Sequence, residues 1–361
     1  MRWFLAAATT QQLGVIRLFH DAGIVGGGGA RDLQIRGDEL VDVDFSRLAD
    51  SRAPAPSFAM VQGSWPENAW MADETIGPSD ARGTTLYHFT KAGWKRVAGF
   101  DEIGLPRFLG FGFGPSGAVL TVVDGATRSG DPERPDNRYI RPPRFRLLAG
   151  KAAGALPAID VPGEDRLLGF AALPSGDLFL VGARAADGKV FVDHWSAGAA
   201  RPQRSELPAG LGSGPPANRA RLVLARSATE VYLAGGSDVM AGGSPYLARY
   251  DGTRWAMIEP PADAPLRSYD VAPDGEVWVV LDGARAGAQS TLWRRAVGAA
   301  AWERVVIEGR GLRPDVVGAA PFDVLARGRG DVWTLVRLDF AGGVQGVGVL
   351  HNRPPSKPMD L

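Results

Sequence analysis

Short apolar runs separated by glycine-rich polar turns recur along the whole chain. Residues 231–258, VYLAGGSDVMAGGSPYLARYDGTRWAMI, show this pattern most clearly. At other places an apolar residue follows a polar turn in the same way, and these anchor positions are Ile24, Ala69, Val119, Leu178, Val231, Val277 and Val332. The anchors recur about every fifty residues, which is a period typical of repeated β units.

The residue after the anchor is aromatic in five of the seven copies: Trp70, Phe179, Tyr232, Trp278 and Trp333. Successive side chains of a strand point to opposite faces of its sheet, so each anchor and its aromatic neighbour face different surroundings. A strand that is apolar on both faces belongs between two sheets rather than on a half-solvated one. The pattern therefore predicts strands inside a stack of sheets.

Each copy also contains a strand–turn–strand segment after the anchor and a further apolar run before it. Residues 246–258 match residues 85–97 in register, so that Tyr250 aligns with Phe89 and Trp255 aligns with Trp94. Each unit is thus predicted to be a meander of four short strands. Four-stranded units repeated radially are the blades of a β-propeller.

One unit resembles a kelch repeat, because Gly235 and Gly236 close its second strand and Tyr250 and Trp255 follow. The DGEVW segment at 274–278 is also similar to blades of lyase-type and sensor-type bacterial propellers. The resemblance implies an all-β propeller with seven four-stranded blades, or six as the alternative. The aromatic residues expected to form its repeated core are Trp70, Phe179, Tyr232, Trp278, Trp333, Trp94 and Trp255.

A single propeller domain is expected over residues 1–352, followed by a flexible tail at 353–361. The last unit lacks a fourth strand, and residues 2–7 resemble the fourth strand of another unit at 254–258. The N-terminal strand is therefore predicted to close the ring, which removes an exposed strand edge. In the six-bladed alternative, residues 1–50 are an extension. With seven blades, these are expected near residues 8–47, 55–98, 104–160, 164–208, 216–260, 264–308 and 314–352, the last together with 2–7.

Composition and charge exclude several function classes. Forty basic and forty acidic residues give a formal net charge of zero, so no long-range attraction to nucleic acid is expected. The chain has no Cys, which excludes disulfides, thiolate metal sites and a Cys nucleophile. No apolar stretch approaches the length of a membrane span, so no membrane insertion is expected. The start MRWFLAA makes no clear signal peptide, which favours the cytoplasm and leaves the periplasm or exterior open.

Candidate catalytic residues are scarce. Three of the four His, at positions 88, 194 and 351, share one repeat position with Arg249 and Arg294. Copies of one repeat position lie far apart around a ring, so these His are predicted to be structural, and isolated His20 is treated likewise. The motifs of copper oxidases, sialidases, quinoprotein dehydrogenases and calcium lactonases are incomplete here. The sequence therefore predicts no catalytic residue, no metal site and no cofactor.

Two long loops, at 72–83 and 124–143, are the predicted binding surface. The second loop mixes charges with a Tyr, and Arg and Tyr are common at the energetic centres of interfaces. Its candidate partner-binding residues are Arg128, Asp131, Arg134, Arg138, Tyr139 and Arg141. The alternative interpretation of this loop is a solvated, mobile insertion.

The sequence favours a non-catalytic binding or scaffold propeller that contacts a protein partner through blades two and three, alone or within a larger assembly. One alternative is an enzyme of lactonase or lyase type acting in the central channel on a small molecule with loop carboxylates. The other is a glycan-binding propeller that stacks sugars on Trp65 and Tyr139.

Overall fold

The structure is a computed structural model of the chain, and it describes the following residues. They are 2–9, 17–19, 24–26, 32–43, 58–64, 68–76, 82–90, 92–96, 107–113, 119–124, 144–148, 158–160, 166–184, 186–208, 211, 223–235, 245–262, 264–283, 289–308, 312–354 and 359–360.

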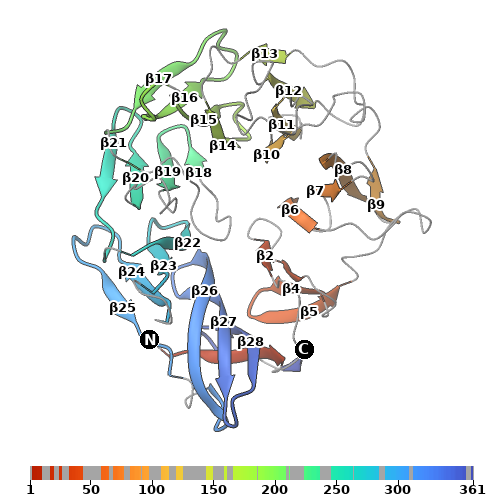
Figure 1. Cartoon of the computed structure of the whole chain (residues 1–361), viewed down its shortest axis with the longest axis vertical. Helices are drawn as coiled ribbons and strands as arrows, with labels where there is room; N and C mark the ends of the chain where they lie inside the picture. Colours follow the sequence, from red (N-terminus) through yellow and green to blue (C-terminus); the bar gives the residue numbers. More distant parts are fainter. Residues whose placement is uncertain are drawn as a thin grey trace, which may run out of the picture.

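The described strands form seven sheets, six of four strands and one of five (Figure 1). We number the sheets one to seven in chain order. Sheet one contains β2 (Arg17–Phe19), β3 (Ile24–Gly26), β4 (Asp32–Arg36) and β5 (Glu39–Val43). Sheet two contains β6 (Phe58–Ser64), β7 (Asn68–Ile76), β8 (Arg82–Thr90) and β9 (Gly93–Arg96). Sheet three contains β10 (Arg107–Phe113), β11 (Val119–Asp124), β12 (Arg144–Leu148) and β13 (Ala158–Asp160).

The second half of the chain continues this order. Sheet four contains β14 (Arg166–Ala172), β15 (Leu178–Ala183), β16 (Val190–Trp195) and β17 (Gln203–Glu206). Sheet five contains β18 (Val223–Ser227), β19 (Glu230–Gly235), β20 (Tyr246–Tyr250) and β21 (Trp255–Ile258). Sheet six contains β22 (Leu266–Val271), β23 (Val277–Leu281), β24 (Thr291–Arg295) and β25 (Glu303–Val305). Sheet seven contains β26 (Val316–Gly328), β27 (Asp331–Phe340), β28 (Gln345–His351), β1 (Phe4–Thr9) and β29 (Met359–Asp360).

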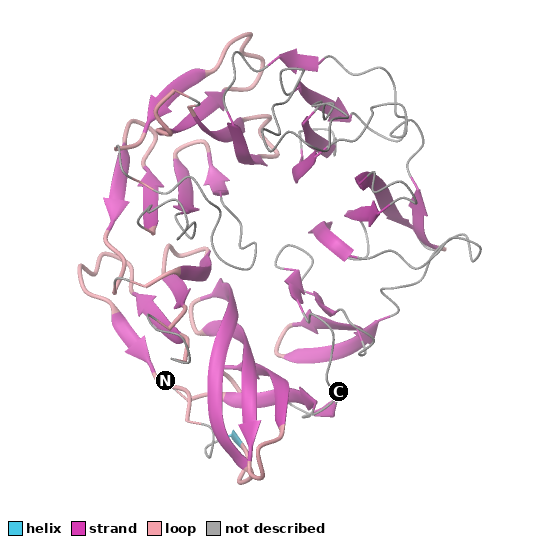
Figure 2. Ribbon diagram, viewed as in Figure 1, coloured by secondary structure: helices cyan, strands magenta, loops and turns pink. Residues whose placement is uncertain are grey.

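The sheets follow one another around a ring, so the fold is an all-β propeller (Figure 2). Contacts join each sheet to the next: β2 to β6, β6 to β10, β10 to β14, β14 to β18, β19 to β22, β22 to β26, and β26 back to β2. Buried apolar clusters fill the spaces between neighbouring sheets, for example between sheets four and five and between sheets five and six. Sheets five, six and seven therefore bury both of their faces against their two neighbours.

The sequence pattern located the second strand of every sheet. Each predicted anchor is the first or second residue of β3, β7, β11, β15, β19, β23 or β27. The aromatic residues that align between two units also lie opposite each other within each unit, on the third and fourth strands. The rings of Phe89 and Trp94 are 5.1 Å apart, and those of Tyr250 and Trp255 are 5.2 Å apart. Six of the seven expected core aromatics are buried, and the seventh, Trp255, is partly exposed.

The N-terminal strand β1 pairs antiparallel with β28 and supplies a fourth strand to sheet seven. It spans Phe4–Thr9, two residues further along the chain than the predicted segment 2–7. Trp3 is 5% exposed and lies edge-on to Trp278 of sheet six, with ring centroids 6.4 Å apart. The N-terminal segment thus joins sheet seven through its backbone and sheet six through a side chain.

The C-terminal segment expected to be a flexible tail contains one more short strand. In this segment β29 pairs in parallel with β1, so that Met359 lies opposite Ala7 and Asp360 lies opposite Ala8. Sheet seven therefore holds residues from both ends of the chain, as Figure 1 shows near the labelled termini.

Candidate functional site

The six predicted partner-binding residues of the 124–143 loop lie outside the described residues, as does Trp65. The structure describes the two ends of this loop. Strands β11 and β12 pair antiparallel, and Val123 lies opposite Arg144. Both ends of the loop are therefore held at adjacent strand termini of sheet three.

The other predicted loop, 72–83, is shorter than expected. Strand β7 continues to Ile76 and β8 begins at Arg82, and these two residues lie opposite each other. Polar residues such as Asp73 and Glu74 are common in loops, but here they belong to β7. They pair with Thr85 and Thr84 in a longer hairpin.

A His or Arg on the third strand lies opposite the aromatic residue of the second strand in five sheets. The opposed pairs are His88 with Trp70, His194 with Phe179, Arg249 with Tyr232, Arg294 with Trp278, and His351 with Trp333. Directly opposed residues point to the same face of a sheet, so these side chains meet. The shared repeat position expected from the sequence is thus a contact position within these five sheets.

In four of these pairs the His or Arg side chain lies close to the aromatic ring. Ring centroids are 4.3 Å apart for Phe179 and His194 and 3.9 Å apart for Trp333 and His351, and both pairs are stacked within 11° of parallel. The Arg249 guanidinium lies 5.9 Å from the centroid of the Tyr232 ring. These contacts add aromatic or cation–π attraction to the burial of the rings.

In four of these five sheets, an acidic residue two positions before the aromatic residue completes a triad of acid, aromatic residue and His or Arg, whereas sheet two has Asn68 at that position. Nε2 of His194 lies 2.9 Å from Oδ1 of Asp177, and Nε2 of His351 lies 3.1 Å from Oδ1 of Asp331. In the sheets that carry Arg, the nitrogen–oxygen distances are 3.0 Å for Arg294 and Glu276 and 3.8 Å for Arg249 and Glu230. The spacing follows from strand alternation, because residues two apart share a face.

Three of the triad acids have shifted pKa values, and the directions differ. Burial acts to raise the pKa of the Asp177 carboxyl, but hydrogen bonds from Ser175 and His194 outweigh it, so this pKa is lowered. The pKa of Asp331 is also lowered, because contacts with His351 and nearby Arg side chains overcome its burial. The pKa of Glu276 is raised, since burial outweighs the attraction of Arg294. Burial, with a smaller contribution from Glu230, raises the pKa of Tyr232 to about 12.

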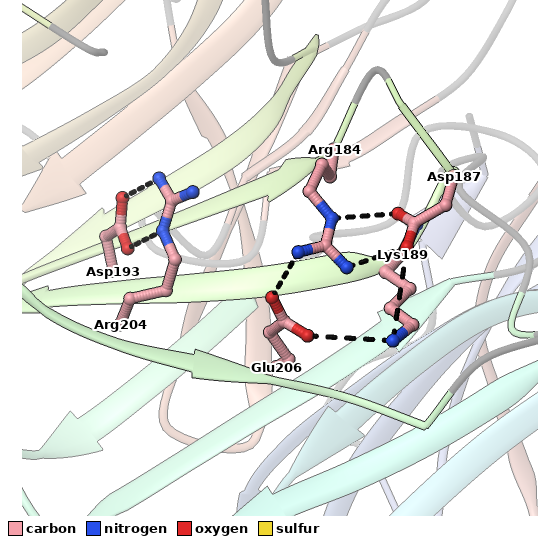
Figure 3. A network of polar contacts seen from close by, with 6 residues as sticks. All are labelled: Arg184, Asp187, Lys189, Asp193, Arg204 and Glu206. Atoms are coloured by element: carbon pink, nitrogen blue, oxygen red, sulfur yellow. Dashed lines mark hydrogen bonds and ion pairs between the residues drawn. The ribbon is translucent and has the colours of Figure 1, made fainter. Parts of the chain in front are cut away.

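Sheet four carries a second polar network, which joins the turn between β15 and β16 to the outer strand β17 (Figure 3). The Arg184 guanidinium donates to Asp187 at 2.7 and 2.9 Å and to Glu206 at 2.9 Å. Lys189 lies 3.9 Å from Glu206 and 4.0 Å from Asp187. Hydrogen bonds from Arg184 are the main reason that the pKa of Asp187 is lowered to about 2. The four charges neutralise one another and tie the turn after β15 to the outer strand β17.

In the same sheet, Arg204 makes two hydrogen bonds of 2.8 Å to Asp193, a carboxylate with no solvent exposure. Figure 3 shows this pair beside the network of Arg184, on strands β16 and β17. The guanidinium also lies over the Phe191 ring at 3.8 Å from its centroid. The pair compensates a buried charge and supports the sheet.

Polar contacts between sheets six and seven were not foreseen from the sequence. The Ser268 hydroxyl donates to Asp323 at 2.6 Å, and the buried carboxylate of Asp270 accepts from the backbone N–H of Ala326 at 2.9 Å. Both contacts join β22 to β26. Strand alternation predicts contacts within a sheet, but it does not identify partners that are 55 residues apart on neighbouring sheets.

Three potential metal-ligating side chains converge where sheet seven meets sheet one. Nε2 of His351 lies 3.1 Å from Asp331 Oδ1 and 3.9 Å from Asp38 Oδ1. Asp38 is in the turn between β4 and β5, and Arg353 donates to it at 3.2 Å. The sequence singled out His351 as a repeat residue but missed Asp38, since a Gly-Asp turn carries no signal of a contact with the other end of the chain.

No family model matches the chain, and no curated protein matches it in sequence. Solved structures do resemble it in fold. A prolyl endopeptidase structure has 13% identity and a TM-score of 0.54, with 96% of this chain and 46% of that one covered. This chain thus spans about half the length of that protein.

Two further structures match at lower TM-scores. YCF48 bound to D1 peptide has 13% identity and a TM-score of 0.43, with 79% and 89% of the two chains covered. A glucose dehydrogenase has 12% identity and a TM-score of 0.41, with 82% and 98% covered. At these identities the likeness bears on the fold alone. Among the described residues, no helix has the length and apolar character needed to cross a membrane.

Proposed function

We propose that this chain is a non-catalytic binding or scaffold module that contacts a protein partner through loops of its second and third blades. In this proposal the seven sheets act as seven blades of one propeller domain over residues 1–352, with kelch-like repeat character at residues 231–258. The loop at 124–143 is its main contact surface.

The observation that carries this proposal is the repeated triad. General acid–base catalysis requires titratable side chains that converge on one reacting group. Within the described part of the chain, His194 and His351 instead stack on core aromatics and pair with acids in separate sheets. Glu276 pairs with Arg294 in the same way. These residues maintain the ring, which leaves the loops for recognition.

The chemistry of the 124–143 loop supports a protein contact. Its Arg residues and Tyr139 are types that contribute strongly to interfaces. Pairing between β11 and β12 brings its two ends together, so the loop connects the paired strands of a hairpin. The contact residues in this proposal are Arg128, Asp131, Arg134, Arg138, Tyr139 and Arg141.

The test is capture of partners from a lysate of the native organism with the tagged full-length chain. A loop variant replaces residues 128–141 with a short Gly/Ser linker. A matched control carries the same linker at residues 284–288, between the second and third strands of sheet six. We expect a near-stoichiometric protein to bind the intact chain and the control but not the loop variant.

Two other outcomes have different meanings. A partner retained by the loop variant would move the contact surface elsewhere on the ring. If the intact chain captured nothing, the binding proposal would be overturned, and a lactone or glycan screen would test the enzyme and lectin alternatives.

A further inference from the structure

Asp38, Asp331 and His351 meet where the ring closes between sheets one and seven. The three come from the β4–β5 turn, the start of β27 and the end of β28. We propose that they bind one divalent transition-metal ion of the Zn²⁺ type, which links the first sheet to the last. This inference does not depend on the proposed function.

The spacing of the ligand atoms suits such an ion. One atom from each residue lies within 4.8 Å of the others, and His351 Nε2 is 3.1 and 3.9 Å from the two carboxylates. Zinc binds His nitrogen and carboxylate oxygen at about 2.0–2.2 Å in tetrahedral sites, which places ligand atoms about 3.4 Å apart. Small side-chain movements of Asp38 would therefore complete the geometry.

The donor set also suits zinc in chemistry and access. An imidazole with two carboxylates is a mixed nitrogen and oxygen set, and the two negative charges neutralise a divalent ion. His351 has no solvent exposure and is held flat on Trp333, whereas Asp38 is 47% exposed. The ion can therefore enter from the Asp38 side and keep a water as its fourth ligand.

Among the residues that the structure describes, the corresponding site between sheets four and five has no third ligand. There His194 pairs with Asp177, but Asp251, in the β20–β21 turn, accepts from the backbone N–H groups of Thr253 and Arg254 at 2.9 Å. Asp251 is thus held in its own turn, whereas Asp38 faces the neighbouring sheet. The His194 site is a natural control.

Arg353 competes with the ion for Asp38. Its Nη1 lies 3.2 Å from Asp38 Oδ1, so a bound cation must displace this contact. The second ring nitrogen of His351, Nδ1, is buried without a hydrogen-bond partner, although most metal-binding His donate from that atom. Stacking on Trp333 orients the ring instead, and we expect a weaker site than one with such a partner.

The experiment is a Zn²⁺ titration of the metal-depleted full chain in competition with a chromophoric chelator, repeated with Co²⁺ and its visible absorption. The proposal predicts one saturable equivalent. Binding should be lost in His351→Gln, weakened about tenfold or more in Asp38→Asn, unchanged in His194→Gln and tighter in Arg353→Gln. Circular dichroism checks that each variant folds, and Asp38→Asn is a near-isosteric change at a side chain that is 47% exposed and contacts Arg353.

Two results would overturn the proposal. One is no saturable binding to the wild-type chain. The other is binding that persists in folded Asp38→Asn and His351→Gln variants with unchanged affinity.

Discussion

His194 lies flat against Phe179, with their ring centroids 4.3 Å apart and their planes 11° from parallel. The two residues are direct partners across β15 and β16. His194 is therefore a packing residue of sheet four. Its polar ring nitrogen is satisfied by the acid two residues before its aromatic partner.

Replacing His194 with Ala should destabilise the fold by about 1–3 kcal/mol. The change removes the stacked ring and leaves the buried Asp177 carboxylate without a hydrogen-bond donor from His194. The free energy of unfolding in urea is the measurement. Arg254→Ala is the control, because that side chain is 83% exposed, and a loss in His194→Ala no larger than in the control would contradict the structural role.

Stability should fall in acid partly through Asp177. Its pKa in the folded protein lies below the ordinary value of 3.8, so the unfolded chain takes up a proton first as the pH falls. The contribution is complete above about pH 4 and is lost as the pH falls through the folded pKa. We expect Asp177→Asn to flatten the acid limb of stability against pH. An acid limb of unchanged slope would show that Asp177 does not contribute.

Gly182→Ala should destabilise sheet four by about 1–3 kcal/mol through overpacking. A Cβ at this position would lie 2.8 Å from Cε1 of Phe191, the residue directly opposite on β16. Gly235 repeats the arrangement in sheet five, where the added atom would lie 2.7 Å from the Tyr246 hydroxyl oxygen. Thermal melts of Gly182→Ala, Phe191→Leu and the double variant form a cycle. In the double variant, the smaller Leu should restore part of the melting temperature lost in Gly182→Ala. Strictly additive effects of the two substitutions would argue against a clash between the added Cβ at position 182 and the Phe191 ring.

Asp270→Ala should cost about 2–3 kcal/mol, because it leaves backbone N–H groups of Val271 and Ala326 without a charged acceptor. The carboxylate is 3% exposed, so water cannot replace it without local rearrangement. The check is hydrogen exchange at the Ala326 amide together with the urea midpoint. Exchange as slow as in the wild type would show that the contact between sheets six and seven is unimportant.

Contacts within a sheet could be predicted from the sequence, whereas contacts between sheets could not. Alternation along a strand places Asp331 and Trp333 on one face, and the hairpin register brings His351 opposite Trp333. The approach of Asp38 to His351 depends on how sheet one is placed against sheet seven. This approach also depends on the conformation of the β4–β5 turn. In the similar β20–β21 turn, the Asp251 carboxylate accepts hydrogen bonds from backbone N–H groups of the same turn.

The ends of strands, and very short strands, could also not be predicted fully from the sequence. Polar residues extended the predicted loop at 72–83, although β7 continues to Ile76. The sequence signal for β1 was the likeness of its apolar run to fourth strands elsewhere. No such signal marked β29, which has only two residues and pairs in parallel with β1.

Strand β1 closes the ring by pairing with β28. The most direct test compares the melting temperature and solubility of three chains: wild type, a deletion of residues 1–9, and a chain in which residues 2–9 are moved to follow Asn352 through an Asn-Gly turn. The deletion exposes the edge of β28 and removes buried Trp3, Ala6 and Ala7, so it should lower the melting temperature and promote association. The moved strand should restore both properties, because it can form a regular hairpin with β28. A deletion variant that is as soluble and as stable as the wild type would contradict ring closure.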